Sequence, residues 1–376
     1  MDITVYRPED LTADDHAAWT TMQSKGFADG HPQLANPFLA PEFTMAVGRC
    51  RRDVRVAVVR EDGPAAQPVA YFPYQRTLSG VGRAVGLGLS DCQGVVHVPG
   101  FRCDARELLK GCGLAIWEFD HLAEGQQTFE RSVTETYPSP VMDVSDGWDA
   151  YVARLRARSG RGTRVRLALE RKLGRAAGEV VRYVHDERDP AMLRTLKEWK
   201  SAQYRRTGRS DRFAHPWISE LVDRLSRTRT ESFAGLLSVL YVGDRPAAAH
   251  FGLRSPHVLS CWFTAYDPAF AKYSPGIVLH LRMARGAAED GLAHLDLGRG
   301  QRDHKEVLKT QEVHVSEGWA TRRHPVAVAH RARRAPARAL RNTVVARPAL
   351  RQPADRLLRT AGKARTWPAT VTRSSR

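Results

Sequence analysis

The residues with the clearest chemical potential lie between Leu259 and Lys305. Ser274-Pro275-Gly276 is typical of a helix start, because Ser suits the N-cap and Pro the first helical position, where its missing N–H costs nothing. The N–H groups of a first helical turn, together with the helix dipole, attract phosphate and pyrophosphate. The local pattern therefore predicts either an anion site or an ordinary helix start.

Asp296 is the second candidate group, and three predicted elements would position it beside the helix start. An apolar, aromatic run over 259–265 reads as a strand, and apolar residues repeat at helical spacing over 277–289. Gly291 then ends the helix, and 293–297 is a second short strand. Because Asp296 stands at the end of that strand, its carboxylate can project into a cleft, or it can cap the strand end.

The order of these motifs resembles a known family, the GNAT-type acetyltransferases of the cellulose-biosynthesis (CelD-like) group. These enzymes are relatives of the Fem-type peptidoglycan aminoacyltransferases. The resemblance extends loosely over 37–309. It rests on Tyr266-Asp267-Pro268, Tyr273-Ser274-Pro275-Gly276, Asp296-Leu297-Gly298-Arg299-Gly300 and Lys305.

The resemblance implies an acyl-CoA donor, acetyl-CoA or another, held by the loop and helix start. In GNAT folds, backbone N–H groups at this junction hold the pantetheine and pyrophosphate. Carried over, that implicates Lys272, Tyr273, Ser274 and Gly276, with Gly276 allowing close approach of the backbone. Lys272 either adds charge beside the pyrophosphate or is a solvated loop lysine. No metal is implied.

Acyl transfer to an amine requires a polarised thioester, an oriented neutral amine and a stabilised leaving thiolate. The resemblance implies that Asp296 orients or deprotonates the amine and that Lys305 contacts substrate or phosphate. Asp296 could instead pair with Arg299, which we otherwise count as a substrate contact. His304 is a candidate base, although the family more usually has an aromatic residue there.

The first half contributes a segment, Ser90-Asp91-Cys92-Gln93-Gly94, that is similar to the family's Ser-Asp-x-Gln-Gly. Asp91 and Gln93 are therefore expected to bind the acceptor by hydrogen bonds, the alternative being a self-contained turn. Trp262 is the aromatic residue nearest the site and a candidate cleft wall. His121, at the end of a strand, reads more readily as a structural histidine than as a base.

The chain as a whole predicts an α/β (α+β) fold of two GNAT-like halves. Each half shows strands, a helical pair, an antiparallel meander, a helix and a strand, which favours mixed, largely antiparallel sheets flanked by helices. We expect halves at 1–145 and 179–323, joined by a basic helical connection over 146–178. A basic, mostly disordered tail over 324–376 would follow.

Net charge, cysteine content and the absence of long apolar runs limit the binding partners and the cell compartment that we expect. The 376 residues carry a net charge of +17, but residues 324–376 hold 13 Lys and Arg against one Asp, which leaves about +5 elsewhere. We therefore expect no dedicated nucleic-acid site, although the tail could contact anionic membranes or nucleic acid weakly. Five cysteines without a CxxC pair, an acidic start and no long apolar run favour a cytoplasmic protein, with a peripheral position at the inner membrane surface as the alternative.

Three functions stay open at this point. The first is transfer of an acetyl or short acyl group from acyl-CoA to an amine on a sugar, polysaccharide or cell-envelope precursor. The second is Fem-type transfer from aminoacyl-tRNA. The third is a non-catalytic GNAT-fold scaffold in polysaccharide or envelope assembly. A cluster of nine Lys and Arg residues between Arg154 and Arg175 is either a solvated helix face or a contact for a phosphate-bearing acceptor.

Overall fold

The computed structural model describes residues 1–61, 67–300 and 303–333. The strands from its first half are β1 Asp2–Tyr6, β2 Val54–Arg60, β3 Pro68–Arg76, β4 Val81–Arg83, β5 Val96–His97, β6 Ile116–Ala123 and β7 Val133–Asp143. The helices of this half are α1 Ala13–Ala28, α2 Pro41–Cys50 and α3 Ala105–Gly111, with short 3-10 turns η1 Pro8–Asp10, η2 Pro32–Ala35, η3 Pro37–Leu39 and η4 Gln127–Ser132.

The second half adds six further strands and the longer helices. Its strands are β8 Val181–Val184, β9 Ala234–Val242, β10 Arg245–Arg254, β11 Val258–Tyr266, β12 His294–Asp296 and β13 Gln311–Thr321. Its helices are α4 Trp148–Arg158, α5 Gly160–Ala177, α6 Pro190–Arg206, α7 Pro216–Arg227, α8 Pro275–Glu289 and α9 Asp303–Glu306, with 3-10 turns η5 Arg212–Ala214 and η6 Pro268–Tyr273.

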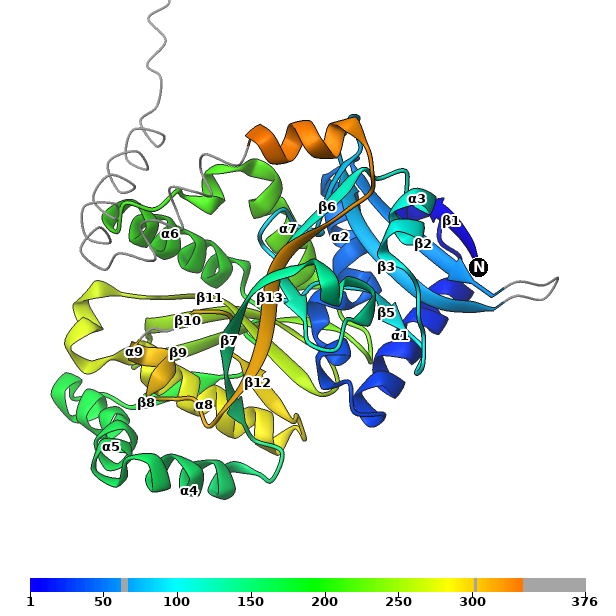
Figure 1. The fold of residues 1–376 in the computed structure, drawn as a ribbon. Helices are drawn as coiled ribbons and strands as arrows, with labels where there is room; N and C mark the ends of the chain where they lie inside the picture. Colours follow the sequence, from blue (N-terminus) through cyan, green and yellow to red (C-terminus); the bar gives the residue numbers. More distant parts are fainter. Residues whose placement is uncertain (62–66, 301–302, 334–376) are drawn as a thin grey trace, which may run out of the picture.

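All the strands belong to one continuous, twisted sheet (Figure 1). Their spatial order is β1-β2-β3-β4-β6-β13-β7-β12-β11-β10-β9-β8, and β5 pairs with β3 outside this path. The pairs β4–β6 and β11–β12 are parallel, whereas the others are antiparallel. The predicted α/β class with a mixed, largely antiparallel sheet flanked by helices is confirmed.

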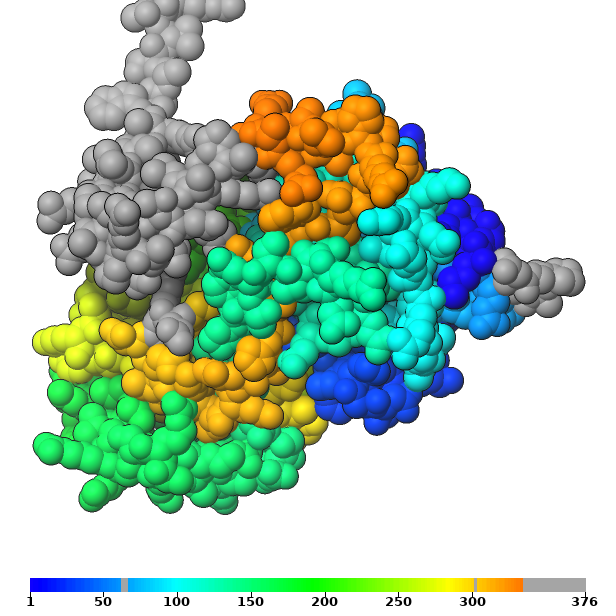
Figure 2. All heavy atoms as spheres, in the orientation of Figure 1, coloured from blue at the N-terminus to red at the C-terminus, as the bar shows by residue number. Residues whose placement is uncertain are grey.

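Two long strands interlock the halves of the chain. β7, from the first half, pairs with β12 of the second, in the register Asp296↔Val141. β13, from the second half, lies between β6 and β7 and pairs with both. In Figure 2 the orange surface that includes β13 lies directly against cyan and green surface of the first half. Each half therefore completes its part of the sheet with backbone from the other.

The hydrophobic core repeats this sharing. One cluster of buried side chains runs from Trp19 and Phe43 in the first half to Leu221 and Phe251 in the second, beneath α1, α2, α6 and α7. A second cluster, which includes Leu279, lies on the opposite face of β9–β11 under α8. Burying large apolar side chains stabilises by about 1.5–3 kcal/mol each, so the shared cluster couples the halves energetically.

The basic connection has two helices rather than one. Helical structure breaks at Ser159, which separates α4 from α5. Gly162 lies inside α5 and does not interrupt it, and the helix continues to Ala177. The tail prediction lies outside the described residues from 334 onward, while 325–333 form a helix that buries Ala327 against Val81 and Ile116. None of the described helices is both long and apolar enough to cross a membrane.

Candidate active site

The sheet opens between β11 and β12. These parallel strands pair from Val258↔His294 to Ser260↔Asp296, where β12 ends. β11 continues to Tyr266, and along this stretch it still pairs with β10 on its other side. A register shift between Phe251 and Gly252 marks a bulge at the point where the opening begins. Such a diverging edge presents backbone N–H and C=O groups to an extended ligand.

The helix start predicted at Ser274-Pro275-Gly276 lies at the mouth of this opening, because η6 carries the chain from the end of β11 to α8. Pro275 is at the first helical position as expected. Ser274 occupies the N-cap position as predicted, but it is left-handed, with φ 52° and ψ 52°, and its side chain makes no capping hydrogen bond. A Cβ added to Gly276 would meet nothing within 4 Å. The approach to its backbone is therefore open.

The other predicted donor contacts frame the same loop. Lys272 is exposed, and its ammonium lies 5.0 Å from the centroid of the Tyr273 ring. Lys200, which sequence analysis did not single out, reaches the opening from α6 and donates from Nζ to the Thr264 carbonyl at 2.9 Å. Two cationic side chains therefore lie at this opening, Lys272 beside the start of α8 and Lys200 along β11.

Asp296 is held at the end of β12 by groups from three parts of the chain. Its Oδ1 accepts hydrogen bonds from Ser139 Oγ of β7 at 2.7 Å and from the Gly298 N–H at 2.9 Å. Its Oδ2 accepts one from Asn36 Nδ2 at 3.3 Å, and Ser260 Oγ donates to Asn36 Oδ1. The Asp296 side chain is therefore fixed, and the alternative of an ion pair with Arg299 is replaced by these three donors.

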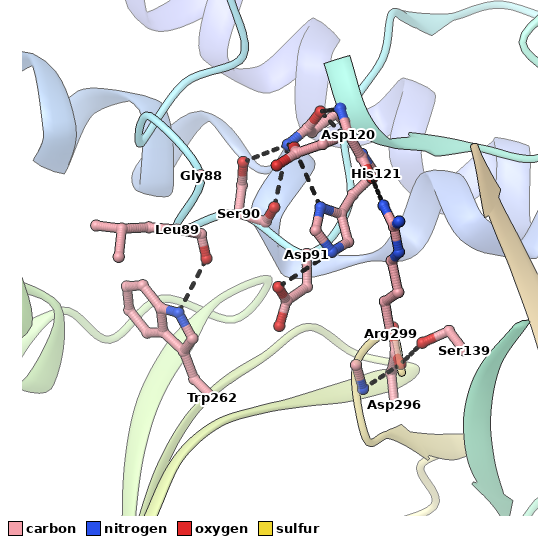
Figure 3. Close-up of polar contacts among 12 residues, drawn as sticks. Gly88, Leu89, Ser90, Asp91, Asp120, His121, Ser139, Trp262, Asp296 and Arg299 are labelled. Atoms are coloured by element: carbon pink, nitrogen blue, oxygen red, sulfur yellow. Dashed lines mark hydrogen bonds and ion pairs between the residues drawn. The ribbon is translucent and has the colours of Figure 1, made fainter. Parts of the chain in front are cut away.

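Asp91 approaches the same point on a loop of the first half (Figure 3). Trp262 of β11 donates from Nε1 to the Leu89 carbonyl at 3.0 Å, and Arg212 donates to the Gly88 carbonyl at 2.8 Å. Both donors come from the second half of the chain, so the loop is tied across the junction. Trp262 therefore packs against the shared core and holds the Asp91 loop, while its role as a cleft wall stays a prediction.

Gln93 holds this loop to β6. Its Nε2 donates to Asp120 Oδ1 at 2.7 Å and to the Ser90 carbonyl at 3.1 Å, while its Oε1 accepts from the N–H groups of Asp120 and His121. The side chain is almost completely buried. Both ends of the amide are used inside the protein, so the predicted contact of Gln93 with an acceptor does not fit this geometry.

His121 lies between two carboxylates. Its Nδ1 is 3.1 Å from Asp120 Oδ1, and its Nε2 is 3.8 Å from Asp91 Oδ1. Burial lowers the pKa of His121, but the bond to Asp120 and the charge of Asp91 outweigh it, so the net pKa is raised. Burial raises the pKa of Asp91, and the neighbouring Asp296 adds to this, while His121 and Lys305 oppose it.

Lys305 and Arg299 complete the junction. Lys305 Nζ donates to the carbonyls of Gly298 and Arg299, at 2.7 and 3.1 Å. A Cβ added to Gly298 would lie 3.0 Å from Asp91 Oδ2 and 3.8 Å from Lys305 Nζ, so these two groups face the same small space. Arg299 donates to the Asp120 carbonyl, pairs with Glu317 and lies over the Tyr137 ring.

The structure thus brings Asp91, Asp296, Lys305 and Trp262 together. Arg299 is committed to protein partners, and His304 lies exposed on α9 beside Lys305 in the chain. Asn36 and Ser139 were missed because they are 260 and 157 positions from Asp296, and no local motif marks such pairs. Sequence analysis read His121 as a structural histidine, because its contact with Asp91 joins β6 to a loop distant in sequence, which no local motif marks.

Comparison with known proteins gives one domain family and several solved structures to which this chain is similar. Residues 161–306 match the acetyltransferase (GNAT) domain family. No curated protein sequence matches the chain significantly. Among solved structures, FemX is similar over 85% of this chain and 96% of its own, with 12% identity and a TM-score of 0.55.

Two further solved structures have a similar extent. A conserved protein of unknown function from Bacteroides thetaiotaomicron covers 82% of this chain and 97% of its own, with 10% identity and a TM-score of 0.51. The C-terminal domain of a putative lysylphosphatidylglycerol synthetase from Agrobacterium fabrum covers 84% and 95%, with 12% identity and a TM-score of 0.49. The chain therefore has a GNAT fold, and its residues 161–306 are similar to the GNAT acetyltransferase domain.

Proposed function

We propose that this protein is an N-acyltransferase that moves an acyl group from acyl-CoA to an amine at the junction of its two halves. One observation carries the proposal: β11 and β12 stop pairing at Ser260 and Asp296, and Asp91 and Lys305 both lie beside Gly298, two residues beyond that point. A GNAT domain match over 161–306 includes the opening and Asp296. The loop of Asp91 comes from the other half, so donor and acceptor would meet where the halves join.

The donor would lie along the free edge of β11 beyond Ser260. Backbone groups there can hydrogen-bond an extended pantetheine arm, as a peptide is bound by an open strand edge. The pyrophosphate would meet the first turn of α8, where the helix dipole favours negative charge by about 0.3–1 kcal/mol. Open space at Gly276 and the exposed cation of Lys272 support this orientation.

The acceptor would bind against Asp91, which is partly open to solvent while Asp296 is enclosed. The Asp91 side chain keeps 27% of its surface exposed. Its carboxylate can attract an ammonium group and accept a proton from it, because burial raises its pKa toward the working range of a general base. Asp91 passes this first proton to solvent, and the neutral amine attacks the thioester carbonyl, so that the new C–N bond replaces the C–S bond. The second proton, lost by the nitrogen of the adduct, is taken by Asp91 and given to the departing thiolate.

The acceptor class follows from charge and from the resemblance to CelD-like enzymes. We propose an amine on a sugar, polysaccharide or envelope precursor that also carries phosphate. The exposed residues Arg161 and Arg164 stand on α5, and Arg166 lines a small cavity of about 140 Å³ between α5 and α8. Neutralising these three arginines is expected to weaken acceptor binding at low salt, measured as an increase in KM; an unchanged KM would exclude this contact.

The activity is tested by thiol release from acetyl-CoA in the presence of amino sugars and other primary amines. We expect the parent protein to release thiol and Asp91→Asn to lower kcat by about 10²–10⁴-fold, the range of a lost general base. Asp244→Asn, on the exposed turn between β9 and β10, is the matched control and should leave the rate unchanged. A folded parent protein that neither binds acyl-CoA nor releases thiol would end the proposal.

A second candidate donor is aminoacyl-tRNA, favoured by the similarity of the fold to FemX over most of both chains. The basic helix α5 offers a surface for phosphates in that case as well. Transfer from aminoacyl-tRNA without binding of acyl-CoA would decide for this donor. The absence of both activities in a folded protein would favour the scaffold hypothesis.

A further inference from the structure

His121 occupies a position that packing alone does not require. It connects two carboxylates of different exposure: Asp91, at the acceptor space, and Asp120, whose side chain is 51% exposed. The His121 side chain itself is 15% exposed. In Figure 3 the imidazole lies between these two acids, with one ring nitrogen toward each.

The position of His121 is fixed from both sides. Gln93 accepts hydrogen bonds from the backbone N–H groups of Asp120 and His121 and donates one to the Asp120 carboxylate. The Asp120 side chain is therefore held next to the backbone of His121. Asp120 in turn contacts Nδ1 of the imidazole at 3.1 Å. This directs Nε2 toward Asp91, whose loop is tied by Trp262 and Arg212. Both ends of the His121–Asp91 contact are therefore anchored.

The charges facing His121 favour a cation there. Asp120, on the same strand, and Asp91, on the loop, are the two acids beside the ring. The opposing cation is Arg299, from the loop after β12, and it is itself paired with Glu317 of β13. The net effect raises the pKa of His121. Burial raises the pKa of Asp120, but the hydrogen bond and charge of His121 outweigh it, so the net pKa of Asp120 is lowered.

We propose that His121, clamped by Asp120, is a positioning residue that keeps Asp91 an oriented carboxylate, ready to accept the proton of the incoming amine. This inference rests on the proposed function of the site. Without the imidazolium, burial and the charge of Asp296 would act on Asp91 without this counter-charge, and the pKa of Asp91 would be raised further. A protonated Asp91 cannot take the proton of the amine.

The test is the pH profile of kcat/KM for the full-length protein and for His121→Gln. We expect the acidic limb of the profile to move to higher pH in His121→Gln, with the largest loss of activity at low pH and partial recovery at high pH. Asp120→Asn should move the limb in the same direction, and the double variant should show much less than the sum of the two shifts. A uniformly lower rate with an unmoved limb would show a merely structural role and overturn the inference.

A matched control and an independent readout keep the two proposals separable. His314 also stands 3.8 Å from a carboxylate, that of Glu124, but on the surface, so His314→Gln should leave the profile unchanged. NMR titration of the His121 ring needs no activity: its pKa should lie above that of an ordinary histidine and fall in Asp91→Asn and Asp120→Asn. An ordinary pKa in the parent protein overturns the inference whatever the donor proves to be, whereas a raised pKa without any acyl transfer would contradict the proposed function alone.

Discussion

At the scale of single residues, the site is a set of charges that hold one another in place. The contact of His121 with Asp120 links stability to pH. Because the pKa of His121 is raised on folding, its contribution is complete below the unfolded value of about 6.5 and disappears as pH rises through the folded pKa. His121→Gln should therefore lower the free energy of unfolding by about 1 kcal/mol at pH 6 and by less at pH 9. This value is smaller than for a buried charged pair because half of the Asp120 side chain is exposed to solvent.

Urea unfolding of the parent and His121→Gln at the two pH values measures this difference. Asp120 contributes with the opposite sign: its pKa is lowered, so its share is present above its unfolded pKa and is lost as pH falls through the folded one. Of these two residues, only His121 changes its charge between pH 6 and 9. A difference between the proteins that grew with pH would contradict the charge assignment.

At the scale of elements, the exchanged strand β13 depends on one close approach. A Cβ on Gly318 would lie 2.1 Å from the backbone oxygen of Ser132 and 2.9 Å from Phe119 Cζ. Gly318→Ala should therefore push β13 away from β7 and destabilise the protein by about 1–3 kcal/mol, the range of overpacking in a core. Gly160→Ala, where a Cβ meets nothing within 4 Å, is the control and should be neutral or slightly stabilising in the same urea experiment. Equal stability of the two variants would show that the contact can relax.

Local patterns predicted the elements that carry the site. The strand expected at 259–265 is β11, and the helix expected to begin at Pro275 and to carry apolar residues at helical spacing over 277–289 is α8. Periodicity and Pro placement determine these elements locally. The left-handed Ser274 was not predictable from capping preferences, because the path of the chain from η6 into α8 sets its dihedral angles. Pairings such as β7 with β12 depend on contacts distant in sequence, which no local pattern encodes.

At the scale of the whole molecule, the two halves are one cooperative unit. β7 and β13 complete the sheet across the junction, and one buried cluster includes side chains of both halves. We expect calorimetry of the full-length protein to show a single unfolding transition, with equal calorimetric and van't Hoff enthalpies. Two resolved transitions would mean that the halves unfold separately and that the exchanged strands couple them weakly.

The proposed function requires the opening between β11 and β12 to bind an acyl-CoA donor, with its pyrophosphate at the start of α8. Calorimetric titration of acetyl-CoA into the full-length protein and into Gly276→Asp tests it most directly. An acid in the first turn of α8 suits the helix dipole and has open space, so folding should be unaffected, but it would repel the pyrophosphate. Gly160→Asp makes the same change at the start of α5, where space is equally open, and should bind as the parent does.

We predict saturable binding by the parent protein and by Gly160→Asp, and binding at least tenfold weaker, about 1.4 kcal/mol, by Gly276→Asp. No binding to the folded parent protein at millimolar acetyl-CoA, or equal binding by all three proteins, would contradict the claim.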